Sequence, residues 1–208
     1  MSNPTSSLST IEAIEQRRSV KHYDPAHKLT EAEIKQLIHL AALAPTSFNI
    51  QPARFVVVTD PALKAEISKA AYDQPQIEES SAVVVITGDT NAYRDAARYW
   101  PDASEEVRKG IVASITGAYE GQPQRQRDEA ILSGGLAAAT LMLAVKAIGY
   151  DSCPMKGFDF DAVSKLINLP EGHIVVLMVT IGKKAAEPHP RTGLLPLDEV
   201  LIRNRFQD

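Results

Sequence analysis

Three short runs of apolar residues limit the folds open to this 208-residue chain. The runs are ARFVVVTD at 53–60, SAVVVITGD at 81–89 and GHIVVLMVTIG at 172–182, and their β-branched composition predicts buried strands. The segments between the runs carry helix signals. The sequence contains no strand–GxGxxG–helix unit and no GxxxxGKS/T loop, so it predicts neither a dinucleotide-binding fold nor a P-loop.

Capping signals mark where several helices begin. Ser9 and Thr30 are each followed by a glutamate three residues later, which is the pattern of a capping box, and Asp60 precedes a first-turn proline. The helix that begins after Thr30 should end at Ala44, because Pro45 disfavours a helical residue before it.

In the second half of the chain, the sequence predicts one long helix from about residue 125 to 148, with Gly149 as its C-cap. It also predicts two helices between residues 91 and 121. The small residues of the long helix let another helix approach closely, either within the chain or at a subunit interface. The C-terminal tail, 183–208, has apolar residues that it cannot bury by itself, so we expect it to lie across a partner subunit.

Composition excludes several classes of protein. Hydrophobic residues make up 44% and charged residues 23%, so we expect a single globular domain, 1–208, with a substantial core. A net charge of -4 argues against general nucleic-acid binding. Neither a signal peptide nor a run of about 20 apolar residues is apparent, so we expect a cytoplasmic protein with no membrane partner.

The single cysteine, Cys153, excludes a disulfide or CxxC metal pair within the chain and is expected to be a small buried residue; no metal site is predicted.

The stretch EQRRSVKHYDP gathers cations and a hydroxyl at Arg17, Arg18, Ser19 and Lys21. One interpretation is a helix end, where each cation complements the helix dipole by about 0.3–1 kcal/mol. The other is a phosphate site, because arginine forks, a serine hydroxyl and a mobile lysine are complementary phosphate donors.

Two further polar segments are candidates for a site. APTSFNIQPARF (44–55) places hydroxyls and amides between two prolines, as a turn does, or as a segment that binds a polar heterocycle does. DSCPMKGFD (151–159) is either a fixed loop with exposed backbone N–H groups or a connection between helices. Arg191, in PHPRTG, carries little meaning alone.

In their order along the chain, these motifs resemble the nitroreductase family of flavoenzymes. RRSVKHYDP, LAPTSFNIQPARFVVV, SSAVVVITGD, the long helix, GYDSCPMKGFD and a terminal PR...PLDEV together span essentially the whole chain. The resemblance implies an α+β fold with a mostly antiparallel central sheet flanked by helices. It also implies an intertwined homodimer that binds FMN at its interface.

The resemblance also implies which residues bind FMN. Arg17, Ser19 and Lys21, with Arg18 as an addition, would contact the phosphate, the ribityl chain and the pyrimidine edge. A second segment would reach the flavin from the other subunit: Pro45, Thr46, Ser47 and Asn49. A third would run along the flavin ring: Pro154, Met155, Lys156 and Gly157. Arg191 would close over the phosphate, and Gln76, chosen over Asp73, would contact the pyrimidine edge.

The implied activity is reduction of nitroaromatics, quinones or similar flat oxidants by NADH or NADPH, in a ping-pong cycle through FMN. No side chain is expected to act as an essential acid or base. Alternatives are an enone or aldehyde reductase or a dehalogenase of the same family, and a non-catalytic FMN-binding dimer. His189 replaces a basic residue common in relatives. Tyr93, Tyr99 and Trp100 form either a lid over the substrate or part of a core.

Overall fold

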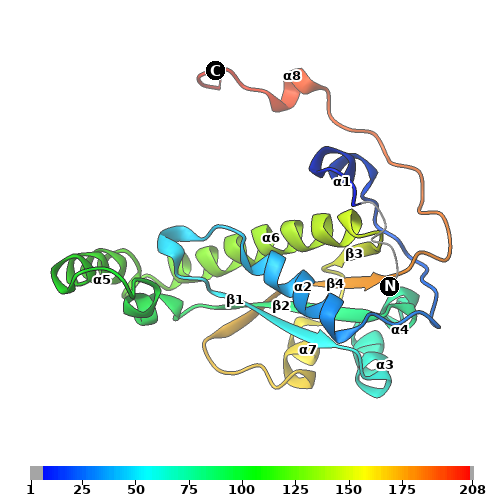
Figure 1. Ribbon diagram of the computed structural model, residues 1–208, viewed down its shortest axis with the longest axis horizontal. Helices are drawn as coiled ribbons and strands as arrows, with labels where there is room; N and C mark the ends of the chain where they lie inside the picture. Colours follow the sequence, from blue (N-terminus) through cyan, green and yellow to red (C-terminus); the bar gives the residue numbers. More distant parts are fainter. Residues whose placement is uncertain (1–6, 207–208) are drawn as a thin grey trace.

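The computed structural model describes residues 7–206 and contains one four-stranded antiparallel sheet (Figure 1). Its strands, in spatial order, are β1 (Ala53–Val58), β2 (Ala82–Asp89), β4 (His173–Gly182) and β3 (Asp151–Met155). Every neighbouring pair is antiparallel. The α+β fold with an antiparallel central sheet is therefore confirmed, and the three apolar runs are three of its strands.

Helices cover both faces of the sheet. The helices are α1 (Thr10–Gln16), α2 (Glu31–Ala42), α3 (Pro61–Ala70), α4 (Pro75–Glu79), α5 (Glu105–Tyr119), α6 (Pro123–Ala147), α7 (Phe160–Leu166) and α8 (Leu197–Val200), with short 3-10 segments η1 (Ser47–Asn49) and η2 (Ala92–Tyr99). The capping boxes predicted at Ser9 and Thr30 are present, and the Asp60 side chain caps α3. Gly149 follows α6 with a left-handed φ of 91°.

The core is divided by the sheet because successive side chains of a strand point to opposite faces. Val83 and Val85 of β2 pack with α3, α4 and α7 on one face. Val84 and Ile86 pack with α2 and α6 on the other. In Figure 1, α6 lies above the sheet, α2 overlaps the strands in this view, and α3 and α7 lie below the sheet. Since β2 is apolar on both faces, it occupies the interior of the sheet.

Strand β3 corrects the sequence prediction, which treated 151–159 as a loop or a helix connection. Asp151–Met155 pairs with β4 along its whole length, and Pro154 lies opposite Val179. Proline cannot donate a ladder hydrogen bond, and β3 tolerates it because β3 is an edge strand. The polar, proline-containing sequence hides this strand because its pairing depends on β4, which is distant in sequence.

Helix α6 is the longest element and packs directly on the sheet. An ideal Cβ on Gly134 would lie 2.8 Å from Val176 Cγ2, so this glycine permits the close approach of α6 to β4. By length and composition alone α6 could also cross a membrane, which the sequence pattern did not predict. Its buried residues, including Ala138 and Leu141, belong to the core between α6 and the sheet, as expected of a core helix in a globular fold.

Large apolar side chains remain exposed on α1, on the outer side of α6 and along the tail. In Figure 1 the tail leaves the sheet, passes α1 and carries α8 away from the rest of the fold. The exposed side chains are Ile11, Ile14, Leu132, Leu136, Leu194, Leu195, Leu197, Val200, Leu201, Ile202 and Phe206. So many exposed apolar residues are unusual for a soluble monomer.

Candidate functional site

The cationic cluster follows α1 as an extended segment beside β3. Val20 is fully buried and its N–H donates to the carbonyl of Ser152 at 3.2 Å. Ser19 forms a parallel bridge with Ser152. Because side chains alternate along an extended chain, burying Val20 directs Ser19 and Lys21 toward the opposite side. The fold thus joins the first and third sequence motifs.

The helix-end interpretation of this cluster fits the geometry poorly. Helix α1 ends at Gln16, and its last turn contains no basic residue. Its final carbonyls instead receive hydrogen bonds from the tail: Arg191 Nη2 donates to Glu15 O at 3.0 Å and to Arg17 O at 3.2 Å. Arg17 is the C-cap residue of α1 and its backbone N–H donates to Ala13 O at 2.9 Å, but no side-chain cation of residues 17–21 bonds the last helix carbonyls in the described part of the chain.

The tail completes a hollow around the cluster. Arg18 Nη2 donates to the carbonyl of His189, which brings the PHPRTG segment onto residues 17–21. The hollow is lined by Arg17, Arg18, Ser19, Lys21, His189, Pro190, Arg191 and Thr192. Four of these side chains are cationic and none is acidic. The fold therefore gives Arg191 a place that its sequence context alone did not indicate.

Arg17 is the least satisfied group of the hollow. Its Nη1 is buried and has no hydrogen-bond partner among residues 7–206. Buried donors in proteins nearly always have an acceptor. An anion with several oxygens, such as a phosphate, would supply acceptors for Arg17 and for its cationic neighbours. The donor set therefore fits a phosphate-bearing ligand.

Cys153 lies behind the cluster and is 1% exposed, as predicted for a small buried residue. Burial raises the pKa of the Cys153 thiol, although Lys21 and Arg17 act in the opposite direction. The thiol is therefore protonated near neutral pH and is not a candidate nucleophile.

The segment after β3 is held by two glutamines. Gln74 Nε2 donates to Gly157 O at 2.8 Å, and Gln76 Nε2 donates to Gln74 Oε1 at 2.9 Å. Gln76 Nε2 also lies 3.7 Å from Met155 Sδ, and Gln76 is 1% exposed. The fold thus places Gln76 against the Met155–Gly157 segment. Gln74, which the sequence analysis did not single out, connects Gln76 to Gly157. Its position directly before the proline that begins α4 is the only sequence signal that marks it.

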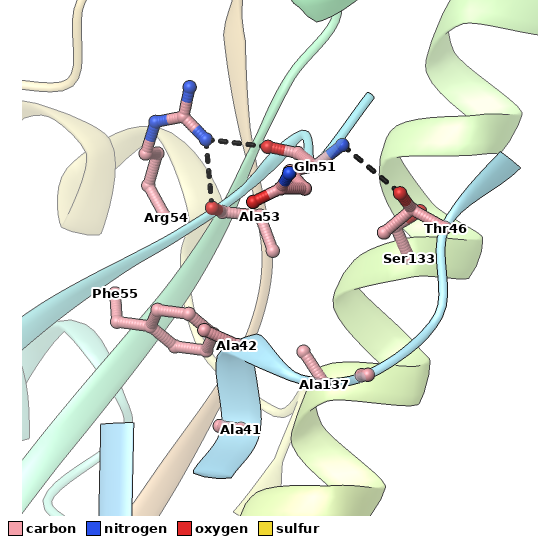
Figure 2. Close-up of a pocket in the computed structure, with 10 residues that line it drawn as sticks. Ala41, Ala42, Thr46, Gln51, Ala53, Arg54, Phe55, Ser133 and Ala137 are labelled. Atoms are coloured by element: carbon pink, nitrogen blue, oxygen red, sulfur yellow. Dashed lines mark hydrogen bonds between the residues drawn. The ribbon is translucent and has the colours of Figure 1, made fainter. Parts of the chain in front are cut away.

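The polar loop 45–51 lies elsewhere, between α2 and β1. Phe48, Asn49 and Gln51 have left-handed φ values of 52°, 56° and 45°. The Gln51 N–H donates to Thr46 Oγ1 at 3.1 Å, which closes the loop on itself. Figure 2 shows this bond and a small hollow between the loop, the end of α2, β1 and α6, into which Thr46 and Ser133 face. Pro45 and Asn49 are exposed.

Helix α6 separates this loop from the cationic cluster. Near the start of α6, Glu129 Oε1 accepts the Ser47 N–H at 3.2 Å. Near its end, Lys146 Nζ pairs with Asp151 of β3 at 2.9 Å. At 1.5 Å rise per residue, Glu129 and Lys146 are about 25 Å apart along the axis. The four predicted loop residues and the cluster therefore do not meet within one chain.

An aromatic cluster adjoins the loop. Tyr93 and Tyr119 stack with ring centroids 5.9 Å apart, and Phe48 meets Tyr119 edge-on at 6.4 Å. Tyr93 is buried, so it is a core residue. Trp100 instead lines an apolar hollow with Phe48 and α5. Lys156 points toward Phe160, with Nζ 5.8 Å from the ring centroid.

The protein combines an antiparallel α+β fold with a cationic hollow whose donors fit a phosphate, and its sequence contains neither of the two nucleotide-binding loops. The model of the Nitroreductase family matches this chain over residues 14–183. The chain belongs to the nitroreductase family.

Three similar proteins illustrate this relationship. Protein DrgA from Synechocystis sp. is 46% identical over 200 residues, which cover 93% of this chain and 95% of that protein. The CLA biosynthesis enone reductase of Lactiplantibacillus plantarum is 31% identical over 182 residues, 83% of this chain and 84% of that protein. A solved protein from Exiguobacterium sibiricum in complex with FMN has a TM-score of 0.89 and 29% identity, covering 97% of this chain and 100% of that chain.

Proposed function

We propose that this chain is an FMN-dependent oxidoreductase that uses NADH or NADPH to reduce nitroaromatics, quinones or similar flat oxidants. Membership of the nitroreductase family and the likeness to a protein solved with FMN support this proposal. The observation that carries it is Arg17, which is one of four cationic side chains lining the hollow and whose buried Nη1 has no acceptor in the described part of the chain.

When bound, FMN would supply the redox chemistry that links the nicotinamide donor to the oxidant. The chain binds and orients the cofactor. Arg17, Ser19 and Lys21 hold its phosphate, ribityl chain and pyrimidine edge, and Arg18 and Arg191 add positive charge around the phosphate. The Pro154–Gly157 segment, which Gln74 and Gln76 contact at Gly157 and Met155, would run along the flavin ring. No side chain acts as an essential acid or base.

The site is completed by a second copy of the chain. The cluster and the 45–49 loop lie at opposite ends of α6, so a twofold partner with its α6 antiparallel brings one chain's loop to the other chain's cluster. The same arrangement covers Leu132 and Leu136 on the exposed side of α6 and gives the tail, 183–208, a surface to wrap. The proposed enzyme is therefore an intertwined homodimer with two shared sites.

A second candidate function is reduction of an enone with the same cofactor. The similarity to an enone reductase over 83% of this chain favours it. Both functions require the same flavin anchor, so they differ in the oxidant only. The apolar hollow lined by Phe48 and Trp100 would select oxidants by their shape.

The first test is the absorption spectrum of the purified protein and the identity of the flavin that heat releases. We expect about one FMN per chain and a particle of twice the chain mass, since one site forms per chain of the dimer. Steady-state assays with NADH or NADPH against a quinone, a nitroaromatic and an enone then select the oxidant. A colourless protein that stays colourless with added FMN refutes the proposal, and an FMN-loaded protein without turnover refutes its enzymatic part.

A further inference from the structure

Glu129 of α6 joins three elements around the 45–51 loop. Its Oε1 accepts hydrogen bonds from the Ser47 backbone N–H at 3.2 Å and from Ser133 Oγ at 2.7 Å. Its Oε2 accepts from the Tyr119 hydroxyl of α5 at 3.2 Å. One carboxylate thus bonds the loop, its own helix and the helix that borders the apolar hollow.

The loop needs such external support. Phe48, Asn49 and Gln51 all adopt left-handed backbone conformations without being glycine. Residues of this kind keep such conformations only where the surrounding structure imposes them. The bond between Gln51 N–H and Thr46 Oγ1 holds the end of the loop, and Glu129 holds its beginning at Ser47.

The Tyr119 hydroxyl extends this support to the aromatic cluster. Tyr119 is buried, stacks on Tyr93 and contacts Phe48 of the loop. Burial raises the pKa of Tyr119, and the Glu129 carboxylate raises it further, although Ser47 and Arg125 act in the opposite direction. The hydroxyl therefore stays protonated and remains a donor to Glu129 at neutral pH.

We propose that Glu129 is a positioning residue for the flavin site. It holds the Ser47 backbone, and thereby sets where Ser47 and Asn49 meet the flavin in the partner's cluster. Through Tyr119 it fixes the loop relative to α5. This inference rests on the proposed function, in which the 45–49 loop contacts FMN.

Three substitutions distinguish the effect of the length of the Glu129 side chain from the effect of its charge. Glu129→Gln keeps the length and an acceptor oxygen for Ser47 but removes the charge. Glu129→Asp keeps the charge but withdraws the oxygens by about one C–C bond, roughly 1.5 Å. Glu129→Ala removes both. Asp128→Asn is the matched control, because Asp128 is an exposed neighbour on α6 that bonds only Gln124 within the described residues.

The experiment measures FMN release from each purified holoprotein in a dilution series, with free flavin determined by fluorescence after ultrafiltration. We expect the Kd for FMN to rise about tenfold to a hundredfold in Glu129→Ala and Glu129→Asp, since in both variants the side chain no longer reaches the Ser47 N–H and the hydrogen bond is lost. Glu129→Gln should stay within about threefold of wild type, and Asp128→Asn should be unchanged. With each protein saturated with FMN, the visible circular dichroism spectrum should differ from that of wild type in Glu129→Ala and Glu129→Asp. The spectrum of Glu129→Gln should match that of wild type.

The outcomes are distinct. A wild-type Kd in Glu129→Ala overturns the inference, and so does a series in which Asp behaves as wild type while Gln fails, because charge would then matter rather than reach. If Glu129→Ala does not fold, the Gln and Asp pair decides alone. Failure of the wild-type protein to bind FMN would instead refute the proposed function.

Discussion

The double substitution Arg17→Ala, Ser19→Ala tests the phosphate anchor most directly. Arg17 has a buried Nη1 without a hydrogen-bond partner among residues 7–206, and Ser19 projects from the same extended segment. A bond from a charged donor contributes about 1.5–3 kcal/mol and a neutral hydroxyl about 0.5–1.5 kcal/mol. Together the loss is about 2–4.5 kcal/mol, which raises the Kd for FMN roughly 30-fold to more than 1,000-fold.

The assay compares FMN with riboflavin, which lacks the phosphate, by fluorescence titration of flavin-depleted protein. We expect the double variant to bind FMN far more weakly while its affinity for riboflavin changes little. Lys35→Ala is the matched control, because Lys35 is an exposed cation on α2 outside the hollow. Its FMN affinity should equal that of wild type.

Two results would refute this reasoning. Wild-type affinity for FMN in the double variant would show that the cluster is not the anchor. An equal loss of FMN and riboflavin affinity would show that Arg17 and Ser19 do not act on the phosphate.

Three further predictions concern packing, pH and the tail. Gly134→Ala should lower the free energy of unfolding by about 1–3 kcal/mol, because the added Cβ overpacks against Val176. Gly117→Ala should raise the free energy of unfolding by about 0.5–1 kcal/mol, because nothing lies within 4 Å of its added Cβ. Calorimetry should show a lower Tm for the first variant and a higher Tm for the second, and Tm shifts of the same sign in both variants would contradict this. Burial lowers the pKa of Lys64 to about 8 from 10.5, so between these pH values the unfolded state binds more protons and stability should rise with pH. Lys64→Met should remove that rise in urea unfolding between pH 8 and 9.5, and equal slopes would disprove it. Deleting residues 194–208 should lower the fraction of protein that is dimeric by mass in solution, and also the FMN bound per chain. A shortened protein that remains fully dimeric would show that the tail is dispensable for the dimer.

Local signals predicted most elements of the fold. The capping boxes at Ser9 and Thr30, the Asp60 cap and the three β-branched runs all act within a few residues, so the sequence displays them directly. Strand β3 was missed because its backbone pairs only with the distant β4.

The site was predictable only where residues of one kind gather in sequence. The 17–21 cluster stands out by its charge, but Arg191 gains meaning only when the tail returns to α1. Gln74 and Glu129 are single polar residues in otherwise ordinary segments, and their partners Gly157 and Ser47 lie 83 and 82 positions away. No local pattern could have revealed such pairs.

The separation of the two half-sites along α6 has a genetic consequence. In the proposed dimer each site combines the cluster of one chain with the loop of the other. A chain defective in the cluster and a chain defective in the loop would therefore complement each other, since their mixed dimer regains one site built wholly from wild-type residues. Random mixing would leave about one quarter of all sites intact, whereas both defects on one chain would leave none in its homodimer.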